Sequence, residues 1–106
     1  MKIILGYYSN NKKNGLGSIY FIKNKSYMIS DYINDVNNDL ILLVDENGNE
    51  MVSKLKEGKI PNPKPPSDHC KKSEKFKKLK QFYEEFSLNL KFINLHDLPK
   101  NVYEIS

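Results

Sequence analysis

Apolar residues in the first half of the chain form short runs separated by polar stretches, which is the pattern of β-strands. Residues 40–44 are the most apolar run and predict a central strand covered on both faces. Residues 50–55 alternate between polar and apolar, as expected for a strand with one wet face. The Asn47-Gly48 pair between these runs predicts a tight hairpin. The predicted strands cover residues 2–8, 18–23, 26–29, 40–44, 50–55, 88–95 and, at an edge, 102–105.

Polar stretches between these runs predict the connections. Residues 9–17 hold three Asn and two Gly and predict a turn-rich loop. Asn24-Lys25 predicts a tight turn, because Asn tolerates a positive φ. Residues 30–38 fit two interpretations, a single helical turn capped by Ser30 or a loop.

After the strands the pattern changes, first to proline and then to a helical period. Residues 57–67 hold four of the five prolines and predict an extended segment, either a connector that crosses the sheet or a docking segment. Residues 68–87 predict one basic amphipathic helix, with Ser67 or Asp68 as its N-cap. Five apolar residues fall on one face of this helix: Phe76, Leu79, Phe82, Tyr83 and Phe86.

Together these elements predict an α+β domain. Its antiparallel sheet has about five or six strands, and one long amphipathic helix packs on a face. A chain of 106 residues is the length of one domain, so residues 1–106 are expected to fold as a unit. The pattern does not set the strand order or the oligomeric state.

Composition changes how the positive charge is interpreted. The chain contains 17 Lys but no Arg, Ala, Thr or Trp, which is typical of a very AT-rich genome. Lysine also lacks the planar fork with which arginine contacts phosphates and guanine edges. The net charge of +4 is therefore weak support for a nucleic-acid partner.

The distribution of charge is more informative than its total. Residues 54–80 hold ten Lys and three acids, a net charge of +7, while the chain on either side is net negative. Codon bias alone does not concentrate lysines in one segment. Lys71, Lys72, Lys75 and Lys78 are therefore the candidate residues for binding an anion or a partner, with Lys71, Lys75 and Lys78 on one stripe of the predicted helix. The alternative is a solvated helix face that keeps the protein soluble.

Seven tyrosines are the second candidate feature. Tyr7, Tyr20 and Tyr27 lie on or beside predicted strands, where exposed aromatic rings stack nucleic-acid bases in many RNA-binding sheets. The alternative is that these rings are half-buried in a small core with their hydroxyls at water.

One cysteine near a helix start is the third candidate. Cys70 at the predicted helix N-terminus favours the thiolate, and His96 with Asp97 would supply a base and a group that orients it. A zinc site from His69, Cys70, His96 and Asp97 lacks any metal-ligand spacing. A structural role for these residues is the more ordinary one, so the sequence predicts no catalytic residue, metal or cofactor.

Cellular location follows from what the pattern lacks. No apolar run reaches the roughly 18 residues that a membrane span needs, and the N-terminal run is too short for a secretory signal. The sequence predicts a cytoplasmic protein without a membrane partner.

Three functions remain in order of preference. The first is a small non-enzymatic binding protein that engages a protein or ribonucleoprotein with an acidic or phosphate-bearing surface, such as a phage or mobile-element inhibitor of a host defence system. The second is a nucleic-acid-binding domain that uses the lysine-rich helix and the sheet tyrosines. The third is a cysteine-dependent enzyme built on Cys70 and His96.

Overall fold

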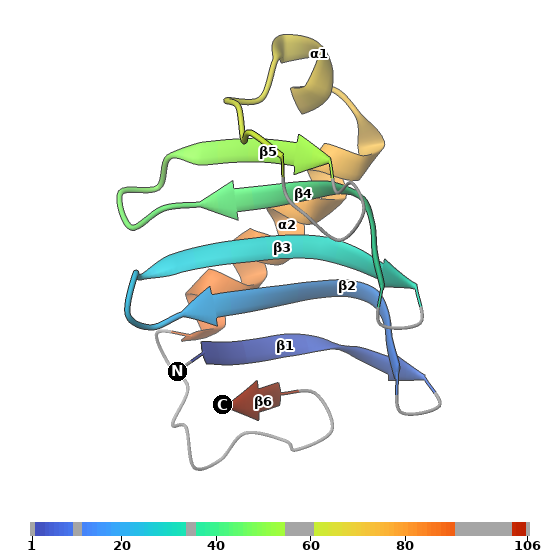
Figure 1. Cartoon of the computed structure of the whole chain (residues 1–106), viewed down its shortest axis with the longest axis vertical. Coiled ribbons are helices and arrows are strands. Elements are labelled where there is room, and N and C mark those ends of the chain that lie inside the picture. Colours follow the sequence, from blue (N-terminus) through green and yellow to red (C-terminus); the bar gives the residue numbers. More distant parts are fainter. Residues whose placement is uncertain (1, 10–11, 34–35, 55–60, 91–102, 106) are drawn as a thin grey trace.

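The computed structural model describes residues 2–9, 12–33, 36–54, 61–90 and 103–105, with side chains described for 12, 14–33, 40–54 and 61–88. The strands are β1 (Lys2–Ser9), β2 (Lys12–Phe21), β3 (Ser26–Ile33), β4 (Val36–Val44), β5 (Glu50–Lys54) and β6 (Tyr103–Ile105). The helices are α1 (Asp68–Lys71) and α2 (Glu74–Leu90). Paired strands are antiparallel, in the order β5-β4-β3-β2-β1-β6 (Figure 1). The predicted class, α+β with an antiparallel sheet, is confirmed.

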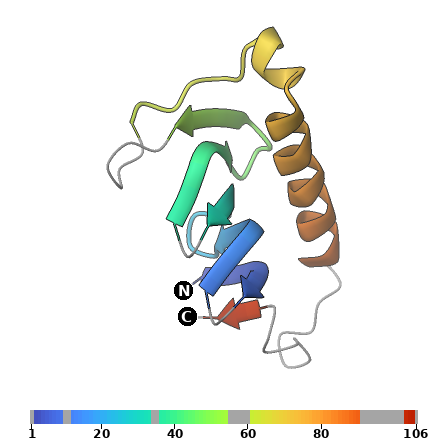
Figure 2. The ribbon, with the colours of Figure 1, turned by 90° about the vertical axis from the view of Figure 1, so that its right-hand side faces the viewer.

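A helix covers one face of this sheet. α2 contacts β2, β3 and β4, and the edge-on view places it on a single side of the strands (Figure 2). Its five apolar residues lie on the sheet side as the helical period predicted: Phe76, Leu79, Phe82 and Phe86 are buried, and Tyr83 is half-buried.

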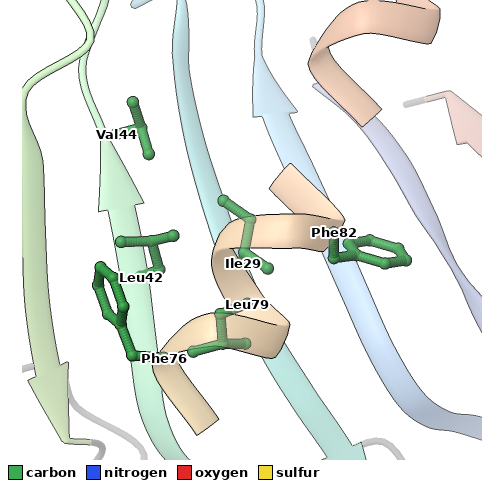
Figure 3. Packing of buried hydrophobic residues seen from close by; sticks show 6 residues of the cluster. All are labelled: Ile29, Leu42, Val44, Phe76, Leu79 and Phe82. Carbon is green, nitrogen blue, oxygen red and sulfur yellow. The ribbon is translucent and has the colours of Figure 1, made fainter. Parts of the chain in front are cut away.

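The core forms between that helix face and alternate residues of the strands. Because strand side chains alternate between faces, Ile29 on β3 and Leu42 and Val44 on β4 point to the same side. These three residues form one buried cluster with Phe76, Leu79 and Phe82 of α2 (Figure 3). Ile29 and Leu42 are also direct partners in the strand register and are fully buried.

Two stretches belong to strands against prediction: residues 9–17, predicted as a loop, and residues 30–38, predicted as a helical turn or a loop. β1 extends to Ser9 and β2 begins at Lys12, so most of residues 9–17 is paired. The β1–β2 register shifts between Gly6 and Tyr8. Gly15 on β2 has a φ of 94°, a conformation that glycine adopts without steric cost. Residues 30–38 form neither a helical turn nor a loop over the described part, because β3 continues to Ile33 and β4 begins at Val36.

The β4–β5 hairpin forms where Asn47-Gly48 predicted it, with a longer connection than two residues. The Gly48 N–H donates to the Asp45 carbonyl at 3.1 Å, and Gly48 has a φ of 83°. The Asp45 carboxylate accepts from the backbone N–H groups of Asn47 and Asn49, each at 2.9 Å. The Asn49 side-chain amide also donates to this carboxylate, at 3.0 Å. That bond is the largest cause of the lowered pKa of Asp45, and the backbone bonds add to it.

The tight turn predicted at Asn24-Lys25 lies in the β2–β3 connection, but its positive φ does not fall on the asparagine. Lys25 has the positive φ, at 53°. Phe21 and Ser26 are register partners, so the connection spans the four residues between them.

The described part of the proline segment, residues 61–67, lies along the outer edge of β5 and does not cross the sheet. Lys64 forms an antiparallel bridge with Val52, through N–H to carbonyl bonds of 2.7 and 3.0 Å. The Ser53 hydroxyl donates to the Pro61 carbonyl at 2.5 Å. Part of an otherwise open sheet edge is thereby covered, which protects it from pairing with other chains.

The predicted single helix over 68–87 is wrong in two respects. It is divided at Lys72-Ser73 into α1 and α2, and α2 continues to Leu90. The predicted strand over 88–95 is therefore wrong at its start, and its remainder lies outside the described residues. No Gly or Pro stops the helix before Leu90, so the alternation of Leu88-Asn89-Leu90 does not end it. The predicted edge strand at 102–105 corresponds to β6, which pairs with β1.

Candidate functional site

The four candidate lysines lie at and just after the junction of the two helices. Lys71 is the last residue of α1, and Lys72 is its C-cap. Lys75 and Lys78 lie in the first turns of α2, and all four side chains are exposed. We call residues 71–73 the elbow.

A serine at each helix start fixes this elbow. The Ser67 hydroxyl accepts from the Cys70 N–H at 3.1 Å and caps α1 as predicted. The Ser73 hydroxyl accepts from the Phe76 N–H at 3.2 Å and donates to the Cys70 carbonyl at 2.7 Å. With one hydroxyl, Ser73 therefore caps the start of α2 and donates to a carbonyl at the end of α1. These bonds satisfy backbone groups that would otherwise lose their partners where the two helices separate.

Replacing this serine should weaken the elbow. Ser73→Ala removes both hydroxyl bonds, and we expect it to lower the free energy of unfolding by about 1–2 kcal/mol, the usual cost of a lost N-cap. Urea denaturation followed by circular dichroism measures the change. Ser73→Thr, which keeps a capping hydroxyl, is the matched control and should lose much less. Equal losses in the two variants would contradict the capping role.

The break also separates the lysines that were predicted to share a stripe. Lys75 and Lys78 line one pocket, whereas Lys71 lines another together with Lys80. The single stripe of Lys71, Lys75 and Lys78 required an unbroken helix with 100° between successive residues. The predicted single stripe is therefore wrong, although each of the three side chains is exposed.

The smaller pocket, of about 140 Å³, lies between the start of α2 and one end of the sheet. We call it the leucine–lysine pocket; its lining residues are Leu16, Asp31, Leu40, Lys75, Lys78 and Leu79. Leu16 and Asp31 are register partners on β2 and β3 and therefore share a face. Lys75, Lys78 and Leu79 are three and four residues apart, which places them on one side of the helix.

The larger pocket, of about 550 Å³, lies between the β4–β5 turn, the proline segment and the elbow. We call it the elbow pocket; its lining residues are Gly48, Asn49, Glu50, Pro65, Pro66, Lys71, Phe76 and Lys80. The Lys80 ammonium pairs with the Glu50 carboxylate and lies 6.0 Å from the centre of the Tyr83 ring. This pair ties α2 to β5 and offsets one of the two positive charges in the pocket.

The two described candidate tyrosines, Tyr20 and Tyr27, face the helix and not an open sheet. Tyr20 and Tyr27 are register partners with ring centres 4.7 Å apart, and both are half-buried. Tyr27 also meets Tyr83 and Phe86 of α2 edge to face, at 5.1 and 6.0 Å between centres. The side chain of Tyr7 lies outside the described set. Tyr20 and Tyr27 are thus arranged as core aromatics and not as a platform for bases.

Burial changes the acidity of the central ring in this cluster. Loss of solvent around Tyr27 raises its pKa from 10.0 to about 12, with smaller contributions from repulsion by Tyr20 and Tyr83 when these are ionised. Burial in the fold therefore favours the neutral phenol over the tyrosinate. The stabilisation is fully present below pH 10.0 and is lost as the pH rises toward about 12.

Two measurements check this behaviour. In absorbance titrations of tyrosinate, Tyr27 should ionise near pH 12, and Tyr27→Phe should remove that step. Between pH 10.0 and about 12, the free energy of unfolding should fall more in the unaltered protein than in Tyr27→Phe. Parallel pH dependences of the two proteins would contradict the assigned burial effect.

The cysteine candidate gains no partner within the described part of the chain. Cys70 is half-buried against the core cluster. His96 and Asp97 lie outside the described residues, so neither the proposed base nor its orienting group is placed. Among the described residues, no group of three or more His, Cys, Asp or Glu side chains is arranged to hold a metal ion.

Three lining residues of the leucine–lysine pocket were not singled out from the sequence. Leu16 lies in a stretch whose residues predict a loop, and Asp31 lies in the stretch that fits a helical turn or a loop. Leu40 begins a run that predicts only a central strand. The usable signal was the alternation Tyr27, Ile29, Asp31, which continues the core-facing positions of β3 by two residues.

Within the described residues, no helix is both long and apolar enough to cross a membrane. Comparison of the chain with protein-family models, with curated proteins and with solved structures gave no match.

Proposed function

We propose that this chain is a small non-enzymatic binding protein that engages an acidic surface of a protein partner through Lys71, Lys72, Lys75 and Lys78. The protein component of a ribonucleoprotein is one such partner. A phage or mobile-element inhibitor of a host defence system is a setting that suits its size and composition. The proposal includes a cytoplasmic location, since a chain with one cysteine needs no oxidising compartment for disulfides.

One observation carries the proposal: exposed lysines crowd around the elbow and the first turns of α2. Lysines near the start of a helix oppose its macrodipole, so the macrodipole of α2 does not favour a lysine at position 75. The exposed acids of the same stretch are fewer, Asp68 and Glu74. A surface of one sign attracts partners of the opposite sign and speeds their encounter. Within residues 61–78 the exposed lysines are Lys64, Lys71, Lys72, Lys75, Lys77 and Lys78.

The tyrosine geometry favours a protein over a nucleic acid as the partner. Tyr20 and Tyr27 are engaged with each other, and Tyr27 also meets α2, so base stacking on them would require α2 to move. The leucine walls of the leucine–lysine pocket instead add apolar contact beside the lysines. Protein interfaces combine an apolar centre with a charged rim in this way.

The test compares two charge-reversal variants in partner capture. Immobilised protein is exposed to lysate of cells that carry the gene and of their host, and bound proteins are identified by mass spectrometry. The captured protein is then purified, and its affinity is measured by calorimetry at 50 and 200 mM salt. Lys75→Glu/Lys78→Glu should weaken this affinity at least about tenfold, equal to about 1.4 kcal/mol. Lys23→Glu/Lys25→Glu, the same charge change in the β2–β3 connection, should leave it unchanged.

A parallel assay with labelled single-stranded RNA and duplex DNA decides the alternative. At physiological salt we expect no affinity beyond the non-specific range of about 10⁻⁴–10⁻⁶ M. Tighter binding that falls steeply with salt and disappears in Lys75→Glu/Lys78→Glu would establish the nucleic-acid function and overturn the proposal. Equal affinity of both variants for the captured protein would overturn it as well.

A further inference from the structure

The leucine–lysine pocket combines three kinds of contact in a space of about 140 Å³. Leu16, Leu40 and Leu79 supply apolar walls from two strands and the helix, while Lys75 and Lys78 supply positive charge from the helix side. Asp31 supplies one carboxylate from β3. Sites for cofactors and drug-sized ligands measure about 300–1,000 Å³, so this pocket suits one residue of a ligand and not a nucleotide.

A ligand that satisfies all three kinds of contact has a short aliphatic group, a carboxylate and an N–H donor. In an aliphatic residue at the C-terminus of a polypeptide, the side chain, the carboxylate and the N–H group are all attached to one Cα atom. A glutamate side chain within a chain offers methylenes and a carboxylate, but three carbon atoms separate its backbone N–H from that carboxylate, so it places no donor beside the carboxylate for Asp31. Capture of a chain terminus through its carboxylate is a recurring mode of peptide recognition.

We propose that the leucine–lysine pocket binds the C-terminal residue of a partner polypeptide. The aliphatic side chain lies against Leu16, Leu40 and Leu79. The terminal carboxylate accepts from the ammonium groups of Lys75 and Lys78, and the last backbone N–H donates to Asp31. This inference rests on the proposed protein-binding function and specifies which part of the partner enters the site.

Methyl-resolved NMR of the full chain tests the site without a known partner. The probes are N-acetyl-leucine, its C-terminal amide and free leucine, each added in physiological salt to protein labelled at leucine methyls. N-acetyl-leucine should cause saturable shifts of the Leu16, Leu40 and Leu79 methyls, with a dissociation constant of about 1–10 mM for a ligand of this size. The amide, which lacks the carboxylate, should bind at least about tenfold more weakly.

Variants assign the polar contacts. Lys78→Gln and Asp31→Asn should each weaken N-acetyl-leucine several-fold, whereas Lys77→Gln, a control on the same helix outside the pocket, should not. Their backbone spectra confirm that each variant is folded, and the comparison of the acid with the amide on the unaltered chain needs no variant. Equal binding of acid and amide, or no saturable shift, would overturn the inference.

Two further outcomes separate the sources of the ligand and the two proposals. Free leucine that binds more tightly than N-acetyl-leucine would identify a free amino acid as the ligand and overturn the assignment to a chain terminus. With the captured partner in hand, deletion of its last residue should weaken binding to the same extent as Lys75→Gln/Lys78→Gln. A partner that needs the lysines but not its own C-terminus would overturn this inference and leave the proposed function standing.

Discussion

Leu42→Ala is expected to lower the free energy of unfolding by about 3–4 kcal/mol. Leu42 is fully buried on β4, with Ile29 and Val52 as its register partners on either side. It belongs to the same buried cluster as Phe76 and Leu79 of α2. The truncated side chain loses the free energy of its own transfer from water and leaves a cavity that neighbours on three elements cannot fill. Urea denaturation followed by circular dichroism measures the loss.

A matched control removes the same kind of side chain from an exposed place. Ile33→Ala lies on β3, where the side chain is 54% exposed, and should cost no more than about 0.5 kcal/mol. In a domain of this size the Leu42→Ala loss corresponds to a decrease of about 10–20 °C in Tm. Similar losses for the two variants would contradict the packing of α2 onto β4.

The same packing positions the candidate site. Leu79 belongs to the core cluster and also lines the leucine–lysine pocket, so the pocket wall is continuous with the core. Lys75 and Lys78 flank it on the helix and have no fixed place relative to Asp31 unless α2 is docked on the sheet. A core variant that loosens α2 should therefore weaken partner binding without touching a lysine.

Periodicity predicted the elements whose burial pattern is local. The face of α2 that carries Phe76, Leu79 and Phe86 follows from helical spacing, and these residues are buried as a set. The β4–β5 hairpin followed from two strand-like runs around Asn47-Gly48. In both cases the residues that decide the structure lie within one or two turns or a single connection of one another.

The elements that were missed depend on contacts between distant residues. β3 and β4 continue past the apolar runs because their polar residues pair with each other, as Asp31 does with Asn38. Their sequence shows Asn and Asp, which are typical of loops, so only the pairing itself identifies a strand. The elbow was missed for a different reason: Ser73 is an acceptable residue within a helix, and its role as a cap follows from where its hydroxyl points.

The candidate site was predictable on one side only. Lysine density along the chain marked Lys75 and Lys78, because charge excess is visible without a fold. The opposing wall could not be assigned, since Leu16 and Asp31 approach the helix only through the register of β2 with β3. Sequence reasoning therefore found the charge and the helix wall of the site but neither the walls supplied by the sheet nor its one carboxylate.

Phe86→Ala is expected to lower the free energy of unfolding by about 3–5 kcal/mol, the usual cost of removing a buried phenylalanine. Phe86 is 1% exposed on the later half of α2, and its ring meets Tyr27 edge to face. This variant tests whether the helix stays docked beyond the core cluster of its first half. Leu88→Ala, at a side chain that is 57% exposed, is the control and should change the stability by no more than about 0.5 kcal/mol.

The pKa of Tyr27 is a second readout of the Phe86 variants. It separates loss of the docking of α2 from loss of contact area alone. If Phe86 helps to exclude water from Tyr27, its removal should lower the pKa of Tyr27 from about 12 toward 10.0. Absorbance titration of tyrosinate at low temperature, where the variant remains folded, measures this pKa. Phe86→Leu keeps an apolar side chain there and should retain most of the shift, at a cost of about 1–2 kcal/mol. A pKa of Tyr27 that stays near 12 in folded Phe86→Ala would contradict the shielding role, because the water that enters the cavity would then not reach the phenol.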